Sequence, residues 1–256
     1  MGALDLFDLS GKTAIVVGGS RGIGFAIADG LASAGARIVI ANRQAEQGKA
    51  AADVLCGKGL SAISRSVDVT RRPAVERLVA ETLAEFGGLD ILVNSAAVIV
   101  RKPIEEVTDE EWQTLMDVNL RGAFVCCQVA GREMLKQKRG KIINIASNIA
   151  QVLQPLRGLY AVSKAGLAHL TRVLALEWAS RGVQVNAIAP APTITDINRG
   201  YFETHPQDLQ ERLRSIPLGR LGDPRDYVGM AVLLASPASD FITGQIIFVD
   251  GGSNLI

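Results

Sequence analysis

A tyrosine and a lysine stand four residues apart in the segment Tyr160-Ala161-Val162-Ser163-Lys164. If this segment is helical, the two side chains lie on one face, one turn apart. A neighbouring ammonium group lowers the pKa of a phenol from its free value of about 10, so such a tyrosine can donate or accept a proton near neutrality. Taken alone, Tyr160 is equally well explained as a half-buried helix residue.

Two further polar residues strengthen the hypothesis of a proton-transfer site. Ser147 follows the β-branched run 141–145 and precedes Tyr160 by thirteen positions. The carboxyl ends of strands in α/β sheets are where ligands bind, so we expect Ser147 and Tyr160 to face one site. Asn119 lies inside a long predicted helix, although Asn is a poor helix former. A solvated helix position is the alternative for Asn119.

A glycine-rich loop, Gly18-Gly19-Ser20-Arg21-Gly22-Ile23-Gly24, follows the first predicted strand and opens a helix. Glycines there permit a tight turn and a close backbone approach, and the helix N-terminus attracts a pyrophosphate. The spacing differs from the common G-x-G-x-x-G fingerprint, but the physical requirement is the same. An ordinary strand-to-helix turn is the alternative. At the start of a long α/β chain, the loop favours a dinucleotide site.

These residues need elements to position them, and the sequence alternates short β-branched runs with longer amphipathic stretches. We predict strands at 13–17, 37–41, 62–67, 91–94, 141–145, 184–189 and 246–249. We predict helices at 24–34, 45–56, 73–86, 109–137, 159–180, 206–215 and 224–235. Thr108 with Glu111 reads as a capping box that opens the fourth helix. Alternation of this kind predicts a parallel α/β sheet with right-handed crossovers.

Composition excludes several classes of protein. The 256 residues are 48% hydrophobic with a formal net charge of +1, which argues against disorder and against a nucleic-acid partner. No apolar run approaches the roughly 20 residues that span a bilayer, so no membrane association is expected. The three cysteines do not form a secreted disulfide framework, and no metal-ligand spacing suits zinc. Without a targeting segment, we expect a cytoplasmic protein.

The chain resembles the short-chain dehydrogenase/reductase family, almost from end to end. The family's Thr-Gly-x-x-x-Gly-Ile-Gly loop matches residues 17–24, with Val17 in place of Thr, and its Ser–Tyr–Lys set matches Ser147, Tyr160 and Lys164. Its Asn-Asn-Ala-Gly motif is here Asn94-Ser95-Ala96-Ala97. The resemblance implies one α/β domain over 1–256: a doubly wound Rossmann-type sheet of seven parallel strands, in the order 3-2-1-4-5-6-7.

The resemblance also implies a reaction. A hydride would pass between a nicotinamide cofactor and a carbonyl or alcohol carbon of a small molecule. Tyr160 would act as the acid or base, Ser147 would hold the substrate oxygen, Lys164 would tune Tyr160 and bind the nicotinamide ribose, and Asn119 would support a relay behind Lys164. The alternative is a non-enzymatic dinucleotide sensor or scaffold on the same fold, because fold does not determine function.

The residues after the second strand bear on which dinucleotide binds. A carboxylate there would bond the ribose hydroxyls of NAD, but the sequence has Asn42 and Arg43. Arg43 and Arg21 could hold a 2′-phosphate, so NADP is expected and NAD is possible; two solvated arginines are the alternative. The cofactor-binding residues expected in all are Gly18, Ser20, Arg21, Gly22, Ile23, Gly24, Asn42, Arg43, Asp68, Val69, Asn94, Ala96, Tyr160, Lys164, Pro190, Thr193 and Thr195.

The substrate is the least readable feature. Residues of about 190–217 are expected to form a lid, and the pocket is expected to draw on Ala97, Asn148, Leu153, Gln154, Ala191, Ile197 and Phe202. Arg157 could hold a carboxylate, although a solvated position explains it as well. The nearest types of enzyme are ketoacyl reductases, gluconate-type dehydrogenases and carbonyl reductases.

A homotetramer is also expected, because two long helices look apolar on more than one face. The residues concerned are Val118, Leu120, Phe124, Val125, Ala165, Leu167, Ala168, Leu170 and Val173. In the family these helices pair across a two-fold axis, and the C-terminal strand with Asp250-Gly251-Gly252 forms a second contact.

Overall fold

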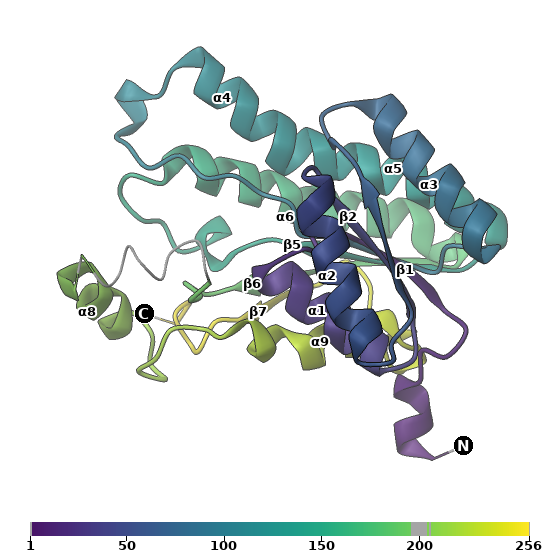
Figure 1. The fold of residues 1–256 in the computed structure, drawn as a ribbon. Helices are drawn as coiled ribbons and strands as arrows, with labels where there is room; N and C mark the ends of the chain where they lie inside the picture. Colours follow the sequence, from purple (N-terminus) through teal and green to yellow (C-terminus); the bar gives the residue numbers. More distant parts are fainter. Residues whose placement is uncertain (1, 196–203, 205, 256) are drawn as a thin grey trace.

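A seven-stranded parallel sheet runs through the computed structural model, which describes residues 2–195, 204 and 206–255 (Figure 1). The strands are β1 (Thr13–Val17), β2 (Arg37–Asn42), β3 (Ala62–Ser66), β4 (Ile91–Asn94), β5 (Gly140–Ile145), β6 (Val183–Pro190) and β7 (Ile246–Val249). Their order is β3-β2-β1-β4-β5-β6-β7, and every neighbouring pair is parallel, which confirms the prediction.

Helices cover both faces of the sheet (Figure 1). On one face lie α1 (Gly22–Ser33), α2 (Ala45–Gly57) and α9 (Val228–Ala235). On the other lie α3 (Arg72–Phe86), α5 (Ala123–Gln137) and α6 (Gly158–Trp178). The remaining helices in the described part of the chain are α4 (Asp109–Met116), which precedes α5, and α8 (Pro206–Arg214). The short 3₁₀ turns are Ala3–Phe7, Ile104–Glu106, Asn148–Ala150, Ala179–Arg181, Pro224–Tyr227 and Pro237–Ser239.

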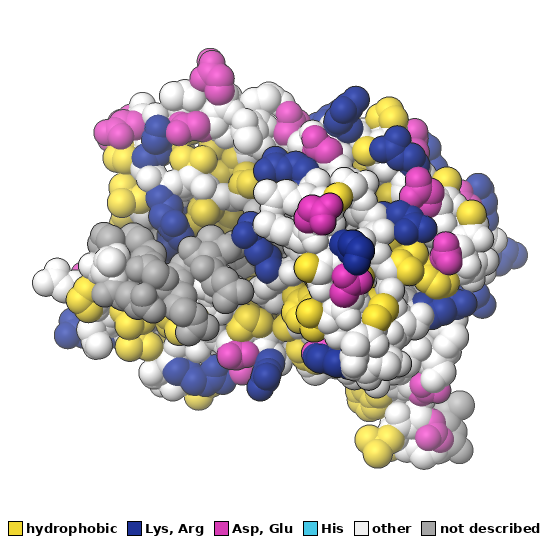
Figure 2. Space-filling model, viewed as in Figure 1, with side chains coloured by type: hydrophobic (Ala, Val, Ile, Leu, Met, Phe, Trp, Pro, Cys, Tyr) yellow, Lys and Arg dark blue, Asp and Glu magenta, His cyan; other side chains and the backbone are white. Residues whose placement is uncertain are grey.

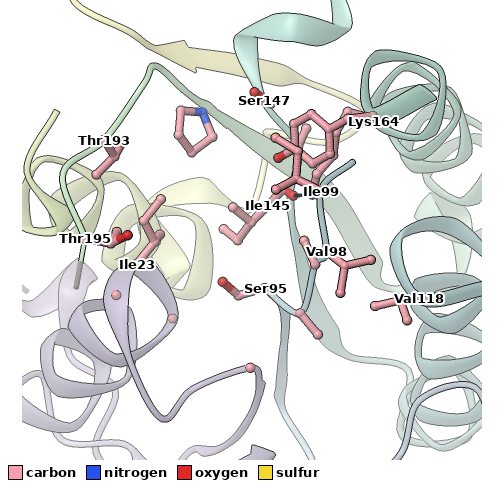
Figure 3. Close-up of a pocket in the computed structure, with 18 of the residues that line it drawn as sticks. Ile23, Ser95, Val98, Ile99, Val118, Ile145, Ser147, Lys164, Thr193 and Thr195 are labelled. Atoms are coloured by element: carbon pink, nitrogen blue, oxygen red, sulfur yellow. Dashed lines mark hydrogen bonds between the residues drawn. The ribbon is translucent and has the colours of Figure 1, made fainter. Parts of the chain in front are cut away.

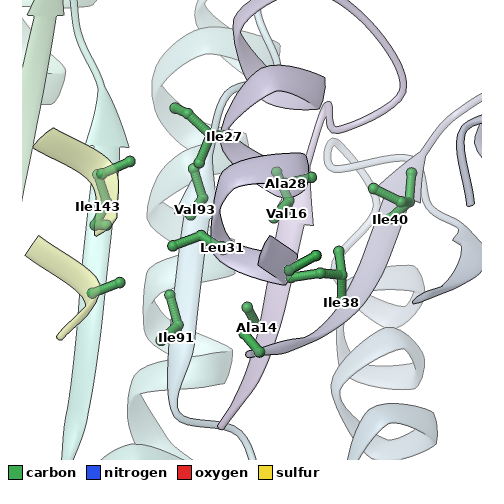
Figure 4. Packing of buried hydrophobic residues seen from close by; sticks show 14 of the residues in the cluster. Ala14, Val16, Ile27, Ala28, Leu31, Ile38, Ile40, Ile91, Val93 and Ile143 are labelled. Atoms are coloured by element: carbon green, nitrogen blue, oxygen red, sulfur yellow. The ribbon is translucent and has the colours of Figure 1, made fainter. Parts of the chain in front are cut away.

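Burial on both faces explains the near-continuous Val and Ile of the strands. All five residues of β1 are buried, and Val16 pairs in register with Ile40 of β2 and Val93 of β4. Ile27, Ala28 and Leu31 of α1 pack over these strands and are fully buried (Figure 4). This packing holds the first strand, the glycine loop and α1 in one rigid unit.

The predicted helix over 109–137 is present but is not uniform. Its capping box is confirmed: Thr108 Oγ1 accepts from the Glu111 amide at 3.3 Å, and Glu111 Oε2 accepts from the Thr108 amide at 3.0 Å. Between α4 and α5, residues Asp117–Gly122 form a π-helical segment with Asn119 near its centre. Such π segments occur frequently at functional sites, since they place a side chain out of helical register.

On the face shown in Figure 2, basic and acidic side chains are interspersed over the helices. Within the described ranges, no helix is both long enough and apolar enough to cross a membrane. The predicted lid at 190–217 includes residues 196–203 and 205, which lie outside the described residues. Its described parts are the segment after β6 and helix α8.

Candidate active site

A cavity of about 430 Å³ opens at the carboxyl ends of the central strands, where the glycine loop, the Ser147 segment and Tyr160 meet (Figure 3). In this view Ile23, Thr193 and Thr195 lie on one side, and Val98, Ile99 and Val118 lie on the other. The cavity is lined by nearly all the residues predicted to bind cofactor: Gly18, Ser20, Arg21, Gly22, Ile23, Gly24, Asn42, Arg43, Asp68, Val69, Ala96, Tyr160, Lys164, Pro190, Thr193 and Thr195.

The glycine loop forms a cradle that side chains would fill. Gly18 has φ +75°, and a Cβ there would lie 2.7 Å from the Ala96 amide nitrogen. A Cβ on Gly24 would lie 2.2 Å from the Gly18 carbonyl oxygen. Helix α1 begins at Gly22, and the side chain of its N-cap residue, Arg21, makes no capping hydrogen bond. A bare helix N-terminus behind an open glycine loop fits the pyrophosphate of a dinucleotide.

The opposite end of the cradle is formed by the residues after β2 and β3. Asp68 accepts from the Thr70 amide at 3.0 Å and from its hydroxyl at 2.7 Å. The hydroxyl bond from Thr70, together with the nearby charge of Arg43, holds the pKa of Asp68 below its ordinary value. Arg21 and Arg43 are both exposed and line the cavity. The Asn42 amide has fewer free hydrogens for a cofactor phosphate than expected, because its Nδ2 donates to the Gln44 carbonyl at 3.1 Å.

Asn94 is the one predicted cofactor-binding residue that does not line the cavity, and its part in cofactor binding remains a prediction. It ends β4, and strand alternation turns it to the face covered by α5. There its Nδ2 donates to Asn144 Oδ1 at 2.9 Å and to Cys127 Sγ at 3.2 Å. Ser95, the next residue, lines the cavity instead.

Ser147, Tyr160 and Lys164 converge on the cavity as predicted. The buried ammonium of Lys164 donates to the Ile145 carbonyl at 2.6 Å and lies 5.7 Å from the centroid of the Tyr160 ring. Burial lowers the pKa of Lys164 to about 8. Burial also raises the pKa of Tyr160 to about 12, against the lowering effects of a hydrogen bond from Ser147 and of the charges on Arg157 and Arg101.

The structure therefore differs from the expectation that Lys164 brings the phenol pKa down. Two guanidinium groups and a hydroxyl group oppose the effect of burial on Tyr160, and burial outweighs them. A phenol with its pKa raised in this way is protonated at neutral pH, as an ordinary phenol is, so Tyr160 can donate a proton to a substrate oxygen.

The side chain of Asn119 lies outside the cavity. It accepts from the Val98 amide at 2.8 Å and donates to the Val98 carbonyl at 2.9 Å and to Ser163 Oγ at 3.2 Å. These bonds fix the loop after β4, whose residues Val98 and Ile99 line the cavity. Asn119 thus positions the wall of the site, and the expected relay behind Lys164 remains a prediction.

Of the predicted substrate residues, Ala97, Asn148, Gln154 and Ala191 line the cavity. Leu153 does not; its side chain is 77% exposed, because the loop turns it outward. Ile197 and Phe202 lie outside the described residues. Sequence reasoning missed Ser95, Val98, Ile99, Val118, Ile149, Arg101 and Arg212, all of which line the cavity.

Arg101 and Arg157 come from two different loops, both line the cavity, and both lie close enough to Tyr160 to lower its pKa. The Lys102 amide donates to the Leu156 carbonyl at 3.0 Å, which ties the two loops together. Leu156 has φ +63°, a conformation that costs a non-glycine residue roughly 1–3 kcal/mol and that persists where its surroundings require it. The strained residue lies directly before Arg157, at the edge of the site.

The segment after β6 is held from behind by a buried hydroxyl pair. Thr193 Oγ1 lies 2.5 Å from the hydroxyl oxygen of Tyr227 and donates to the Ala191 carbonyl at 2.8 Å. The Ile194 amide donates to the Gly222 carbonyl at 2.9 Å. These contacts fix the wall that Pro190, Thr193 and Thr195 present to the cavity.

Comparison with known proteins agrees with this geometry. A family described as enoyl-(acyl carrier protein) reductase matches residues 17–254. The chain is 38% identical to gluconate 5-dehydrogenase of Gluconobacter oxydans (strain 621H), over 97% of this chain and 96% of that protein. It is 42% identical to 2-dehydro-3-deoxy-D-gluconate 5-dehydrogenase of Bacillus subtilis (strain 168), over 97% and 96%.

A solved structure is also similar: gluconate 5-dehydrogenase from Burkholderia cenocepacia J2315 in complex with NADP and tartrate, with 37% identity, a TM-score of 0.95 and full coverage of both chains. The chain therefore belongs to the short-chain dehydrogenase/reductase family. It is an NAD(P)-dependent oxidoreductase that transfers a hydride between the nicotinamide and a carbonyl or alcohol carbon of a small molecule.

Proposed function

We propose that the enzyme interconverts a secondary alcohol and a ketone on a small hydroxy acid of the sugar-acid type, with NADP as its cofactor. The observation that carries this proposal is the pair Arg101 and Arg157 at the substrate end of the cavity. Both guanidinium groups are close enough to Tyr160 to lower its pKa. Arg recognises carboxylates through its planar fork, so this end of the site suits an anionic substrate.

In the proposed mechanism, Tyr160 gives its proton to the substrate oxygen during reduction and takes it back during oxidation. The nicotinamide, when bound, supplies or accepts the hydride. Ser147 donates a hydrogen bond to the same substrate oxygen, and Lys164 would hold the nicotinamide ribose. Asn119 holds the Val98 loop against the site.

The names of the relatives agree with an acidic substrate. Two are named for gluconate or a dehydro-deoxy-gluconate, and the solved structure contains tartrate, which carries two carboxylates. Helix α8 adds Arg212, whose Nη1 bonds Gln154 Oε1 beside the cavity. This contact supports the part of the expected lid that the structure describes, helix α8, as a cover over the substrate end.

A panel of matched substrates tests the proposal. Ketone and alcohol pairs with and without a carboxylate, such as 5-ketogluconate against fructose and gluconate against sorbitol, are assayed by NADPH absorbance at 340 nm. Acids are expected to be turned over with the higher kcat/KM. Equal turnover of acids and neutral polyols would contradict the acid preference, and absence of turnover on the whole panel would contradict the proposed substrate class.

The cofactor preference is a separate prediction. NADPH is expected to bind about tenfold to a hundredfold more tightly than NADH, because a hydrogen bond to a charged group contributes roughly 1.5–3 kcal/mol. Arg21 and Arg43 would contact the 2′-phosphate, and their exposure places the effect near the lower value. Titration by cofactor fluorescence measures both affinities.

The double substitution Asn42→Asp with Arg43→Leu should invert this preference. It adds an acceptor for the ribose hydroxyls that also repels the phosphate. Arg71→Leu is the control, since Arg71 lies near Asp68 but outside the cavity lining. Equal affinities for the two cofactors in the wild-type protein would refute the assignment of Arg43.

We also propose a homotetramer, built on α5 and α6. Phe124, Val162, Val173 and Leu176 of these helices are 36–84% exposed. Sedimentation at micromolar concentration is expected to show a tetramer, and Leu176→Glu should yield smaller species. Leu4→Glu, at an equally exposed position in the first turn, should leave assembly unchanged. A wild-type monomer would rule out the proposal.

The apolar surface that α5 and α6 expose differs in part from the surface expected from sequence. Val125, Leu167 and Ala168 are buried within the subunit, because their side of each helix packs on the sheet or on its neighbour. They cannot supply an interface. The free, buried thiols Cys126 and Cys127 are in keeping with a reducing compartment, and we propose a cytoplasmic location.

A further inference from the structure

A chain of buried polar groups joins the C-terminal turn after β7 to the catalytic serine. Its members are Asp250, Ser253, Asn148 and Ser147; the first three are 4–5% exposed. Asn148 and Ser253 are 105 positions apart in the sequence, and their side chains meet at 2.8 Å. Asn148 also lines the cavity.

The direction of each hydrogen bond follows from Asp250. Its Oδ1 accepts from the Gly252 amide at 3.1 Å, and its Oδ2 accepts from the Asn254 amide at 2.9 Å. Ser253 Oγ lies 3.1 Å from Oδ2. A carboxylate only accepts, so the single hydroxyl hydrogen of Ser253 is directed to Asp250.

The hydrogen bond from Ser253 to Asp250 also determines the orientation of the Asn148 amide. Because the Ser253 hydrogen is used, the Ser253 oxygen must accept, and the Asn148 group that faces it is the amino group Nδ2. The other end of the amide, Oδ1, is turned to Ser147 Oγ at 3.5 Å. Asp250 therefore determines, through Ser253, which end of the Asn148 amide faces the catalytic hydroxyl.

The consequence for Ser147 is a defined hydroxyl orientation. The Ile149 amide donates to Ser147 Oγ at 3.3 Å, and Asn148 Oδ1 offers an acceptor for its hydrogen. At 3.5 Å this second bond is long, so the hydrogen exchanges readily to a better acceptor such as a substrate oxygen. A reversed amide would instead donate to the second lone pair of the Ser147 oxygen, beside the one that accepts from the Ile149 amide, and would leave the Ser147 hydrogen without this acceptor.

We propose that Asn148 and Ser253 are positioning residues that orient the Ser147 hydroxyl, which makes the Asp250–Asn254 turn part of the active site. This inference rests on the proposed role of Ser147 in the reaction. It assigns to the C-terminal turn a function in turnover in addition to its packing.

Ser253→Ala tests the inference, with Ser253→Thr as its matched control. The alanine removes the acceptor that fixes Asn148, so the amide can rotate. A neutral hydrogen bond contributes roughly 0.5–1.5 kcal/mol, so kcat is expected to fall about threefold to tenfold with an unchanged NADPH Kd. Threonine keeps the hydroxyl and should recover most of the turnover.

A pH profile separates positioning from a merely structural effect. Ser147 has one hydroxyl hydrogen, for which Asn148 Oδ1 and the Tyr160 oxygen compete. Loss of the Asn148 acceptor in Ser253→Ala leaves this hydrogen to Tyr160, so the kinetic pKa of alcohol oxidation should fall. Asn148→Ala should give the same shift, and the double variant should be no worse than either single one.

Wild-type kcat and pH profile in Ser253→Ala and Asn148→Ala, or fully additive effects in the double variant, would overturn the inference. Circular dichroism and thermal melts establish that each variant is folded. If the wild-type enzyme turns over no member of the substrate panel, the proposed function fails instead, so the two failures are distinguishable.

Discussion

Tyr160→Phe is expected to lower kcat by about 10²–10⁴-fold, which is the usual contribution of general acid–base catalysis. The substitution keeps the ring, its packing and its place beside Lys164, and removes only the group that exchanges the proton. NADPH affinity should therefore stay close to that of the wild-type protein. Stopped-flow turnover and a fluorescence titration on the same preparation measure the two quantities.

The pH dependence provides the control for this prediction. Because burial raises the pKa of Tyr160 to about 12, the phenol is protonated at neutral pH. Alcohol oxidation needs the phenolate, so its rate should rise with pH, whereas carbonyl reduction uses the protonated form and should not rise. Tyr160→Phe should lose the rise. Retention of a tenth of the wild-type activity by this variant would refute the role given to Tyr160.

The fold was predictable because its determinants are local and repeated. Each strand is a short β-branched run covered on both faces, and nearly all predicted elements end within two residues of the observed bounds. One exception is the helix predicted at 224–235, whose first residues, Pro224–Tyr227, form a 3₁₀ turn, so that α9 begins at Val228. The other is the π segment at Asp117–Gly122, which adds a hydrogen-bonding register that hydrophobic periodicity does not reveal. A poorly helix-forming Asn119 was the only signal there.

The site residues that could be predicted are likewise those placed by regular strands and helices. Residues that follow a strand end, such as Gly18 and Ser147, or lie within a regular helix, such as Lys164, were found because a regular element determines their position. The side chain of Asn94 lies on the face of the sheet that α5 covers, and the next residue, Ser95, lines the cavity.

Loop residues were not predictable by this reasoning. Arg101 lies in an irregular loop after β4, and its position depends on a long-range bond between Lys102 and Leu156. Leu156 has a positive φ, and nothing about a leucine in the sequence indicates that backbone conformation. The electrostatics of Tyr160 show the same limit, because its pKa is shifted by burial, by the hydrogen bond from Ser147 and by guanidinium groups from two loops.

Replacing both arginines at the substrate end, Arg101→Gln with Arg157→Gln, is expected to lower kcat/KM for the carboxylate substrate by about 100-fold or more. Each hydrogen bond to a charged group contributes roughly 1.5–3 kcal/mol, which is about 10-fold to 150-fold in affinity. The matching neutral ketone should lose little. The measurement is made in the reducing direction, because the loss of two positive charges also raises the pKa of Tyr160 and slows alcohol oxidation for every substrate.

Lys102→Gln is the matched control for charge. Lys102 is the neighbour of Arg101, but its ammonium pairs with Glu111 at 2.8 Å and does not line the cavity. If a general attraction of anions explained the preference for acids, Lys102→Gln would lower kcat/KM for the carboxylate substrate about as much as either arginine substitution. If the arginines only supported the loops, the double variant would lose acid and neutral substrates alike. Selective loss of the acid in the double variant, with Lys102→Gln unaffected, is the result expected of a carboxylate site formed by two loops that Leu156 holds together.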